Sequence, residues 1–297
     1  MKFNKLFHNE KFLALLFFMP FAVLFFIFTI LPVLSSLVLS LTSYSVVQPP
    51  IFVGIQNFKY LFTEDNIFIK ALINTLVFAF FSGVIGFFAS FFIAWVIDGL
   101  KGKMFFAIAF YAPSITSGIA MSIVWLTFFS ADSYGFINNT LLNIGFIDTP
   151  LLFTKDPKLI GFMVIFVSIW MGMGNGFLAF LAGFQNLSHE ISEAAYVDGV
   201  SNKFQELIYV ILPQMKPMLL FGAVTAVTGA FNIYEVPLVL AGSPGPENAS
   251  LTLVGHMLDY AFTRLDLGYA SCVAVVLFFI TFTLGRVLFK VLASKDE

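Results

Sequence analysis

Six long stretches of the chain carry no charged residue and are dominated by apolar side chains. A helix needs about 20 such residues to cross the roughly 30 Å hydrocarbon core of a bilayer. Backbone groups in lipid must satisfy their hydrogen bonds internally, and these stretches are too long for barrel strands. The pattern therefore predicts an all-α membrane protein with six transmembrane helices, over about 12–41, 71–97, 104–130, 159–187, 217–240 and 267–292.

Composition excludes several other classes of protein. Hydrophobic residues make up 59% of the chain and charged residues only 11%, against about 25% charged in a soluble domain. A net charge of −2 gives no reason to expect nucleic-acid binding. The single cysteine, Cys272, cannot form a disulfide within the chain, and His8, His189 and His256 are too scattered for a metal site. We expect no bound metal.

Lysine and arginine residues set the expected orientation, because they concentrate on the cytoplasmic side of membrane proteins. With the N-terminus inside, the inside segments hold ten of the 15 lysine and arginine residues. Six spans then return the C-terminus to the inside, so both termini are predicted to be cytoplasmic. We interpret 1–297 as one transmembrane domain whose largest cytoplasmic segment is 188–216.

That cytoplasmic segment has the sequence pattern of a helix, a turn and a second helix. Ser188 is a suitable N-cap, and acidic residues follow it where a helix N-terminus favours them. Gly199 can adopt the left-handed conformation that ends a helix, and Ser201 is expected to cap the next one. From this chemistry alone, an amphipathic helix that merely links two spans remains an alternative.

The same segment resembles the EAA motif of permeases in binding-protein-dependent ABC importers. The matching residues are Glu193, Ala194, Ala195, Asp198, Gly199, Val210, Leu212 and Pro213. Val210 is a departure, since the motif has isoleucine there. The resemblance continues through Phe52–Phe62, Tyr134–Leu142, Ser168–Ala195 and Leu267–Phe278, and it is strongest to the first-named permease subunit of the maltose, glycerol-3-phosphate and multiple-sugar group. The large extra outer domain and extra N-terminal spans of the maltose version are missing.

The resemblance implies a type I ABC importer permease fold in the bacterial cell membrane. It implies a permease subunit that lies in membrane lipid and forms half of the translocation pathway for a mono- or oligosaccharide. The implied partners are a second homologous permease, a cytoplasmic ATPase dimer and an extracellular solute-binding protein. The residues implied to couple to the ATPase are Glu193, Ala194, Ala195, Asp198, Gly199, Leu212 and Pro213.

The chain itself is not expected to be an enzyme. It has no GxxxxGK[ST] phosphate-binding loop. ATP and Mg are therefore expected on the partner ATPase, with no cofactor in this chain.

Glu235 is the one acid within the predicted spans, and ionisable groups there are candidate functional residues. Asn232 lies three residues earlier, hence on the same helical face. The resemblance places sugar contacts on the fourth and fifth spans, at Gly172, Asn175, Thr228, Phe231, Asn232 and Glu235. An aromatic ring with amide and carboxylate groups suits a sugar. Two alternatives remain open: Glu235 as an interfacial carboxylate, and Gly172 with Gly176 as a helix-packing motif.

Polar residues near Pro113 also have two interpretations. Ser114, Thr116 and Ser117 can line the path or satisfy backbone groups that Pro113 leaves unpaired, and we favour the second.

A self-contained secondary transporter or channel is the alternative function. It predicts internal repeats and ionisable coupling groups in mid-membrane, and the sequence displays neither. An intramembrane enzyme would need paired acids, a Ser/His pair or HExxH within the spans, and these are also missing from the sequence. Glu235 as the sole acid, with no arginine in the predicted path, favours a neutral sugar, while polyols and glycerol-3-phosphate stay open.

Overall fold

The computed structural model describes residues 10–293, except the side chains of Glu10, Phe12, Asn175, His189, Leu292 and Ala293. The predicted cytoplasmic ends therefore lie outside the described residues, as does His8. Within residues 10–293 the regular secondary structure is helical apart from a two-residue ladder, in which β1 (Thr42–Ser43) pairs antiparallel with β2 (Ile51–Phe52), and an isolated bridge.

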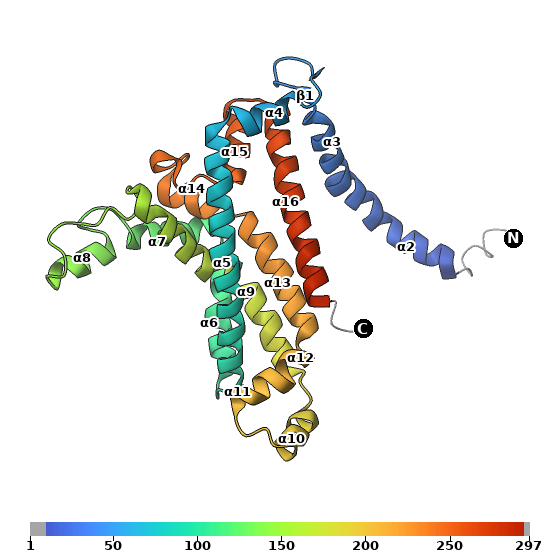
Figure 1. Cartoon of the computed structure of the whole chain (residues 1–297), viewed down its shortest axis with the longest axis vertical. Coiled ribbons are helices and arrows are strands. Elements are labelled where there is room, and N and C mark those ends of the chain that lie inside the picture. The colour runs from blue at the N-terminus through green and yellow to red at the C-terminus, as the bar shows by residue number, and fades with distance from the viewer. Residues whose placement is uncertain (1–9, 294–297) are drawn as a thin grey trace. The chain divides into compact units, whose positions relative to one another are not determined.

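The helices follow one another along the chain as Figure 1 labels them. They are α2 (Glu10–Phe25), η1 (Phe26–Ile30), α3 (Leu31–Leu39), α4 (Gln56–Thr63), α5 (Asn66–Asp98), α6 (Lys103–Ile115), α7 (Gly118–Phe128), α8 (Phe136–Asn143), α9 (Pro157–Gln185), α10 (His189–Val197), α11 (Lys203–Glu206), η2 (Leu207–Ile211), α12 (Leu212–Gln214), α13 (Lys216–Phe231), α14 (Glu235–Ala241), η3 (Pro246–Asn248), α15 (Leu253–Leu258), η4 (Asp259–Thr263) and α16 (Leu267–Ala293).

Five helical segments among the described residues are long and apolar enough to cross a membrane. They are Leu13–Leu39, Asn66–Asp98, Pro157–Gln185, Lys216–Ala241 and Leu267–Val291. A sixth crossing is available only if α6 and α7 count together, and these two helices meet at a bend of 101°. The predicted spans thus agree with the helices to within a few residues, while the third is broken.

The break between α6 and α7 follows from local chemistry. Pro113 lacks a backbone donor, and Thr116 is extended, with φ −82° and ψ 150°. The hydroxyls of Ser114 and Thr116 donate to the carbonyls of Tyr111 and Ala112, each at 2.8 Å, where α6 ends. Ser117 caps α7 by accepting from the Ala120 N–H at 3.5 Å. These side chains thus bond backbone groups at the break, but the carbonyl that loses its helical donor at Pro113 is that of Ala109, so the prediction that they satisfy the groups freed by Pro113 stays a prediction.

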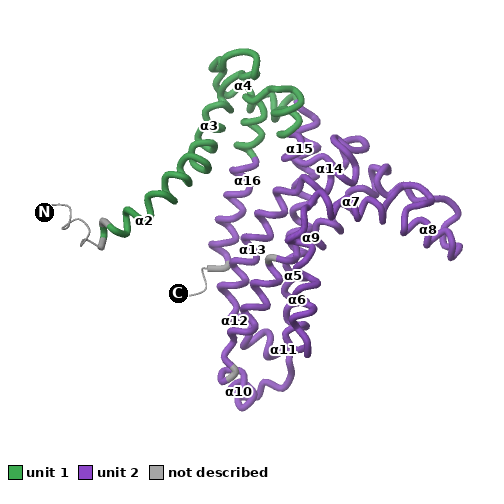
Figure 2. The backbone as a smooth tube through the Cα atoms, turned by 180° about the vertical axis from the view of Figure 1, so that it is seen from behind, with its two compact units in different colours: residues 1–64, 257–276 green, residues 65–256, 277–297 purple. Residues whose placement is uncertain are grey.

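The described chain divides into two compact units, coloured separately in Figure 2. The first comprises the residues up to Glu64 with Met257–Val276. There the Asn57 amide donates to the carbonyls of Ser40 (2.9 Å) and Thr42 (2.8 Å), which fixes α4 against the chain that follows α3. The single-domain interpretation of 1–297 stays a prediction.

The second unit, Asp65–His256 with the residues from Leu277, contains the main helix bundle. Helix α5 packs along α9, α13 packs on both, and α6 packs on α9 (Figure 1). One phenylalanine-rich cluster includes Phe91, Phe177 and Phe180 and extends to η2. Another joins α5 and α9 to α14. Full burial of one such side chain contributes about 1.5–3 kcal/mol, so these clusters hold the bundle together.

A buried polar contact fixes the start of α5. Asp65 Oδ1 accepts from the Phe68 N–H at 2.8 Å and so caps the helix. Asp65 Oδ2 lies 3.0 Å from His256 Nε2 on α15, and both side chains are buried. His256 therefore has a structural partner in the buried Asp65.

Candidate functional site

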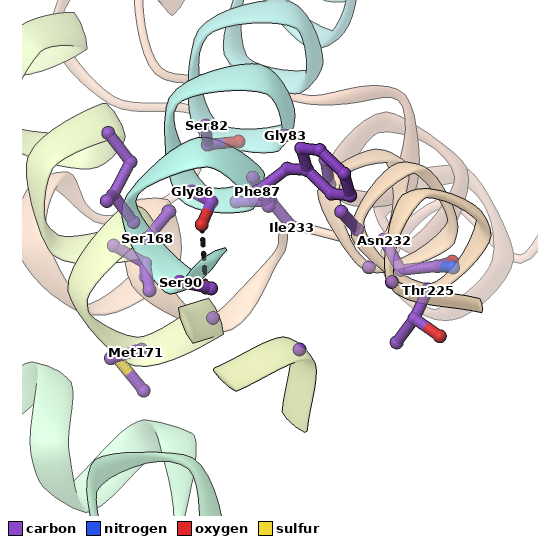
Figure 3. Close-up of a pocket in the computed structure, with 18 of the residues that line it drawn as sticks. Ser82, Gly83, Gly86, Phe87, Ser90, Ser168, Met171, Thr225, Asn232 and Ile233 are labelled. Carbon is purple, nitrogen blue, oxygen red and sulfur yellow. Dashed lines mark hydrogen bonds between the residues drawn. The ribbon is translucent and has the colours of Figure 1, made fainter. Parts of the chain in front are cut away.

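A pocket of about 490 Å³ opens within the second unit, between α5, α9, α13 and the start of α14 (Figure 3). Its lining is mostly apolar or glycine. The polar side chains along it are Ser82, Ser90, Ser168, Thr225, Asn232 and Glu235, with Tyr234. Pockets of this size and composition are typical of small-molecule sites.

Two interrupted helices meet beside this pocket. Helix α13 ends at Phe231 and α14 begins at Glu235, and the residues between them line the pocket. The second half of the broken third span, α7, packs on α14. An ideal Cβ built on Gly118 would lie 1.7 Å from Glu235 Oε2, so the carboxylate rests directly against the first residue of α7. In membrane transporters, interrupted helices of this kind mark substrate sites.

Three of the predicted pathway residues, Gly172, Asn232 and Glu235, line the pocket. Phe231 is buried and is not among its lining residues. Thr228 is exposed, its hydroxyl donates to the Val224 carbonyl, and its carbonyl accepts from the Asn232 amide, both at 2.8 Å. The side chain of Asn175 lies outside the described part of the chain. The prediction of pathway roles for these residues stays a prediction.

Gly172 and Gly176, the two glycines on α9 with alternative interpretations, differ in their surroundings. A Cβ on Gly176 would meet Ser90 of α5 at 3.7 Å, which is ordinary packing distance. A Cβ on Gly172 would meet nothing within 4 Å. Both glycines line the pocket, and neither position requires glycine for close packing against a neighbour.

The sequence analysis missed the contribution of α5. Ser82, Gly83, Gly86 and Ser90 recur at helical spacing and line the pocket from one face of α5 (Figure 3). Such a stripe of small residues is the signal that could have indicated them. Ser168 on α9 carried no comparable signal.

The segment with the EAA pattern forms a short exposed helix, α10, at one end of the second unit (Figure 1). Glu193, Ala194 and Asp198 are exposed and Ala195 is half-buried. Gly199 has φ +102°, so the predicted left-handed conformation after the helix is confirmed. Ser188 occupies the N-cap position but its side chain makes no capping bond.

The predicted cap of the second helix was wrong. Asn202, not Ser201, caps α11, because its side chain accepts from the N–H groups of Phe204 (3.1 Å) and Gln205 (2.9 Å). The Ser201 hydroxyl instead donates to the Gly199 carbonyl at 3.1 Å. An amide one residue later is better placed to reach both donors.

Two contacts connect α10 to the bundle. The Tyr196 hydroxyl donates to Glu206 Oε2 at 2.7 Å, and this hydrogen bond holds the pKa of Tyr196 above its ordinary value. Leu207 and Ile211 of η2 are buried in the phenylalanine-rich cluster, and Leu212 packs against it. Pro213 is exposed. These contacts join α10, through α11 and η2, to the helix bundle.

Comparison with known proteins identifies the class. The chain is 32% identical over 296 residues to the probable ABC transporter permease protein YesP of Bacillus subtilis, covering 98% of this chain and 93% of the relative. It is 28% identical over 291 residues to the arabinooligosaccharides transport system permease protein AraP of the same organism, covering 97% and 91%. No protein-family model matches the chain.

Solved structures agree on the fold. A chain of a bacterial ABC transporter involved in import of the acidic polysaccharide alginate superposes with a TM-score of 0.82 at 21% identity, covering 99% of this chain and 100% of that one. A bacterial alginate ABC transporter in complex with an alginate pentasaccharide-bound periplasmic protein gives 0.82 at 20% identity, covering 96% of each chain. The chain belongs to the family of ABC transporter permeases, and it is a multi-pass protein of the cell membrane.

Proposed function

We propose that the chain is one permease subunit of an ATP-driven importer for a carbohydrate and forms half of its translocation pathway. The observation that carries this proposal is the pocket at which two interrupted helices meet, lined by hydroxyl, amide and carboxylate groups. The arabinooligosaccharide permease among its relatives supports a sugar as the cargo. A mono- or oligosaccharide fits the polar groups along the pocket.

In this proposal the chain crosses the membrane six times, with α6 and α7 forming one broken crossing. Both termini are cytoplasmic, and α10 faces the cytoplasm. Gly172, Asn175, Thr228, Phe231, Asn232 and Glu235 belong to the pathway region, and of these Gly172, Asn232 and Glu235 lie on the pocket itself.

Helix α10 is proposed to dock on a cytoplasmic ATPase dimer that binds ATP and Mg. The docking element comprises Glu193, Ala194, Ala195, Asp198 and Gly199, with Leu212 and Pro213 behind it. Closure of the ATPase would move α10, and η2 would pass that movement to the bundle. A second homologous permease completes the pathway, and an extracellular solute-binding protein delivers the sugar.

Co-purification tests the proposal. The chain is expressed with its genomic-neighbour permease and ATPase, and the ATPase is captured from detergent through this chain. We expect capture by the native chain and loss of capture by the double variant Glu193→Gln with Gly199→Val, because valine is strained at φ +102°.

The matched control is Gly145→Val, which removes another glycine of positive φ, at +71°, from a loop after α8. This control should still capture the ATPase. Failure of the native chain to capture the ATPase, with the permease pair intact, would instead favour a self-contained secondary transporter.

A further inference from the structure

The relatives and structural neighbours include transporters of both an arabinooligosaccharide and an acidic polysaccharide, so similarity alone leaves the charge of the cargo open. The pocket contains groups that bear on that question. We infer, resting on the proposed function, that it accepts uncharged sugars and rejects anionic ones, with Glu235 as the discriminating charge and Ser168 as a hydroxyl-binding residue.

The charge balance of the pocket is the first observation. Among the described residues that line it, the ionisable side chains are Glu235 and Tyr234, and none is lysine, arginine or histidine. A phosphate or carboxylate on the cargo would find no cation there. It would instead meet the Glu235 carboxylate, and two like charges in one pocket repel each other.

The position of that carboxylate is the second observation. Glu235 Oε2 rests against Gly118, and an ideal Cβ on Gly118 would overlap it at 1.7 Å. Any residue with a Cβ at position 118 would occupy the space that the Glu235 carboxylate fills. The first turn of α7 is also a favourable place for a negative charge, because helix N-termini carry positive potential. Gly118 is therefore a positioning residue for Glu235.

The unsatisfied hydroxyl of Ser168 is the third observation. Ser168 Oγ is buried and has no hydrogen-bond partner in the part of the chain that the structure describes. The other two serines on the wall already donate hydrogen bonds. Ser82 donates to the Phe78 carbonyl at 2.5 Å, and Ser90 donates to the Gly86 carbonyl at 2.6 Å (Figure 3). Buried polar groups are normally satisfied, and a hydroxyl both donates and accepts. A sugar hydroxyl supplies the missing partner.

These observations converge on a hydroxyl-rich, uncharged ligand. Ser168 comes from α9, while Asn232 and Glu235 come from the interruption between α13 and α14. Groups on different elements therefore face one ligand, and pocket-lining glycines such as Gly172 leave room for its ring.

Matched sugar pairs test the inference on the importer complex captured through this chain, without its solute-binding protein. The probes are glucose with glucuronate, galactose with galacturonate, and mannose with mannuronate, each measured by equilibrium dialysis. We expect at least one neutral sugar to bind at least about tenfold more tightly than its uronate. Glu235→Gln should bring that ratio close to one by strengthening uronate binding, and Gly118→Ala should lower it.

Ser168→Ala should weaken binding of the neutral sugar by about threefold to tenfold and leave the ratio unchanged. The matched controls, Ser36→Ala on α3 and Gly285→Ala on α16, lie outside the pocket and should bind as the native complex does.

Equal binding of both members of each pair, a ratio that Glu235→Gln does not change, or no sugar binding by an intact complex would each overturn the inference. Loss of ATPase capture by the native chain would contradict the proposed function itself, so the two failures are distinguishable.

Discussion

Two glycines of α13 differ in what surrounds them. Gly222 on α13 faces the buried ring of Phe180, and an ideal Cβ there would lie 2.4 Å from the ring. Gly229, two turns further along the same helix, would meet nothing within 4 Å. Glu235 was identifiable from the sequence because a charge within a span is rare. Ser168 was not, because the sequence does not reveal which hydroxyls lack partners.

Gly222→Ala should destabilise the protein. Overpacking in a well-packed core costs about 1–3 kcal/mol, so the thermal unfolding midpoint of the purified chain in detergent should fall. Gly229→Ala is the matched control and should leave that midpoint unchanged or raise it, since alanine is favoured over glycine within helices. Equal effects of the two changes would contradict the predicted contact with Phe180.

Asp132 gives a pH-dependent prediction. A hydrogen bond from Ser130 lowers the pKa of Asp132 below its ordinary value of 3.8, with help from the N–H groups of Tyr134 and Gly135 and from Lys155. The ionised form is thus favoured in the folded loop, which gains stability above pH 3.8 and loses it as the pH falls through the lowered value.

Asp132→Asn should therefore make this loop more susceptible to limited proteolysis at neutral pH. The difference from the native chain should shrink as the pH falls below 3.8, read with an acid-active protease. A difference that persists unchanged there would show that the charge is not responsible. Asp148→Asn, at a carboxylate in the following loop, is the control.

At the scale of whole elements, the two interrupted spans matter most. The apolar stretch over 104–130 predicted a single crossing, and Pro113 indicated local disruption, but not that α7 turns through 101°. The direction in which α7 runs depends on its packing against α14, a contact between residues more than a hundred positions apart in the sequence. Similarly, the left-handed turn at Gly199 was predictable from composition, whereas the tie between Tyr196 and Glu206 was not.

Tyr196→Phe removes that tie and keeps the ring. Because this hydrogen bond is exposed, we expect α10 to stay folded and capture of the ATPase to weaken by no more than about tenfold. Tyr209→Phe, at an exposed tyrosine of η2, is the control and should behave as the native chain. Complete loss of capture by Tyr196→Phe would indicate a direct contact between the hydroxyl and the ATPase.

At the scale of the whole molecule, hydropathy and charge placed the membrane-crossing segments to within a few residues, because the bilayer imposes both length and composition. Neither pattern predicted the short β1–β2 ladder or the division into two units, which depend on contacts between distant segments.

Orientation is testable with single cysteines. Cys272 is buried, so Cys272→Ala provides an unreactive background. In that background, Ser133→Cys should react with a membrane-impermeant maleimide added to intact spheroplasts, and Ser201→Cys should react only after the membrane is opened. Both positions are exposed. The reverse pattern would invert the proposed topology.

The broken spans give the chain a modular construction. Helices α6 and α13 pack with α5 and α9, while α7 and α14 pack chiefly on each other and also contact α9. Evolution can therefore alter α7 and α14 without repacking the phenylalanine-rich cluster, whose described members come from other helices. Chimeras between related permeases should tolerate crossovers at Thr116 and Ile233 better than crossovers within α5 or α9.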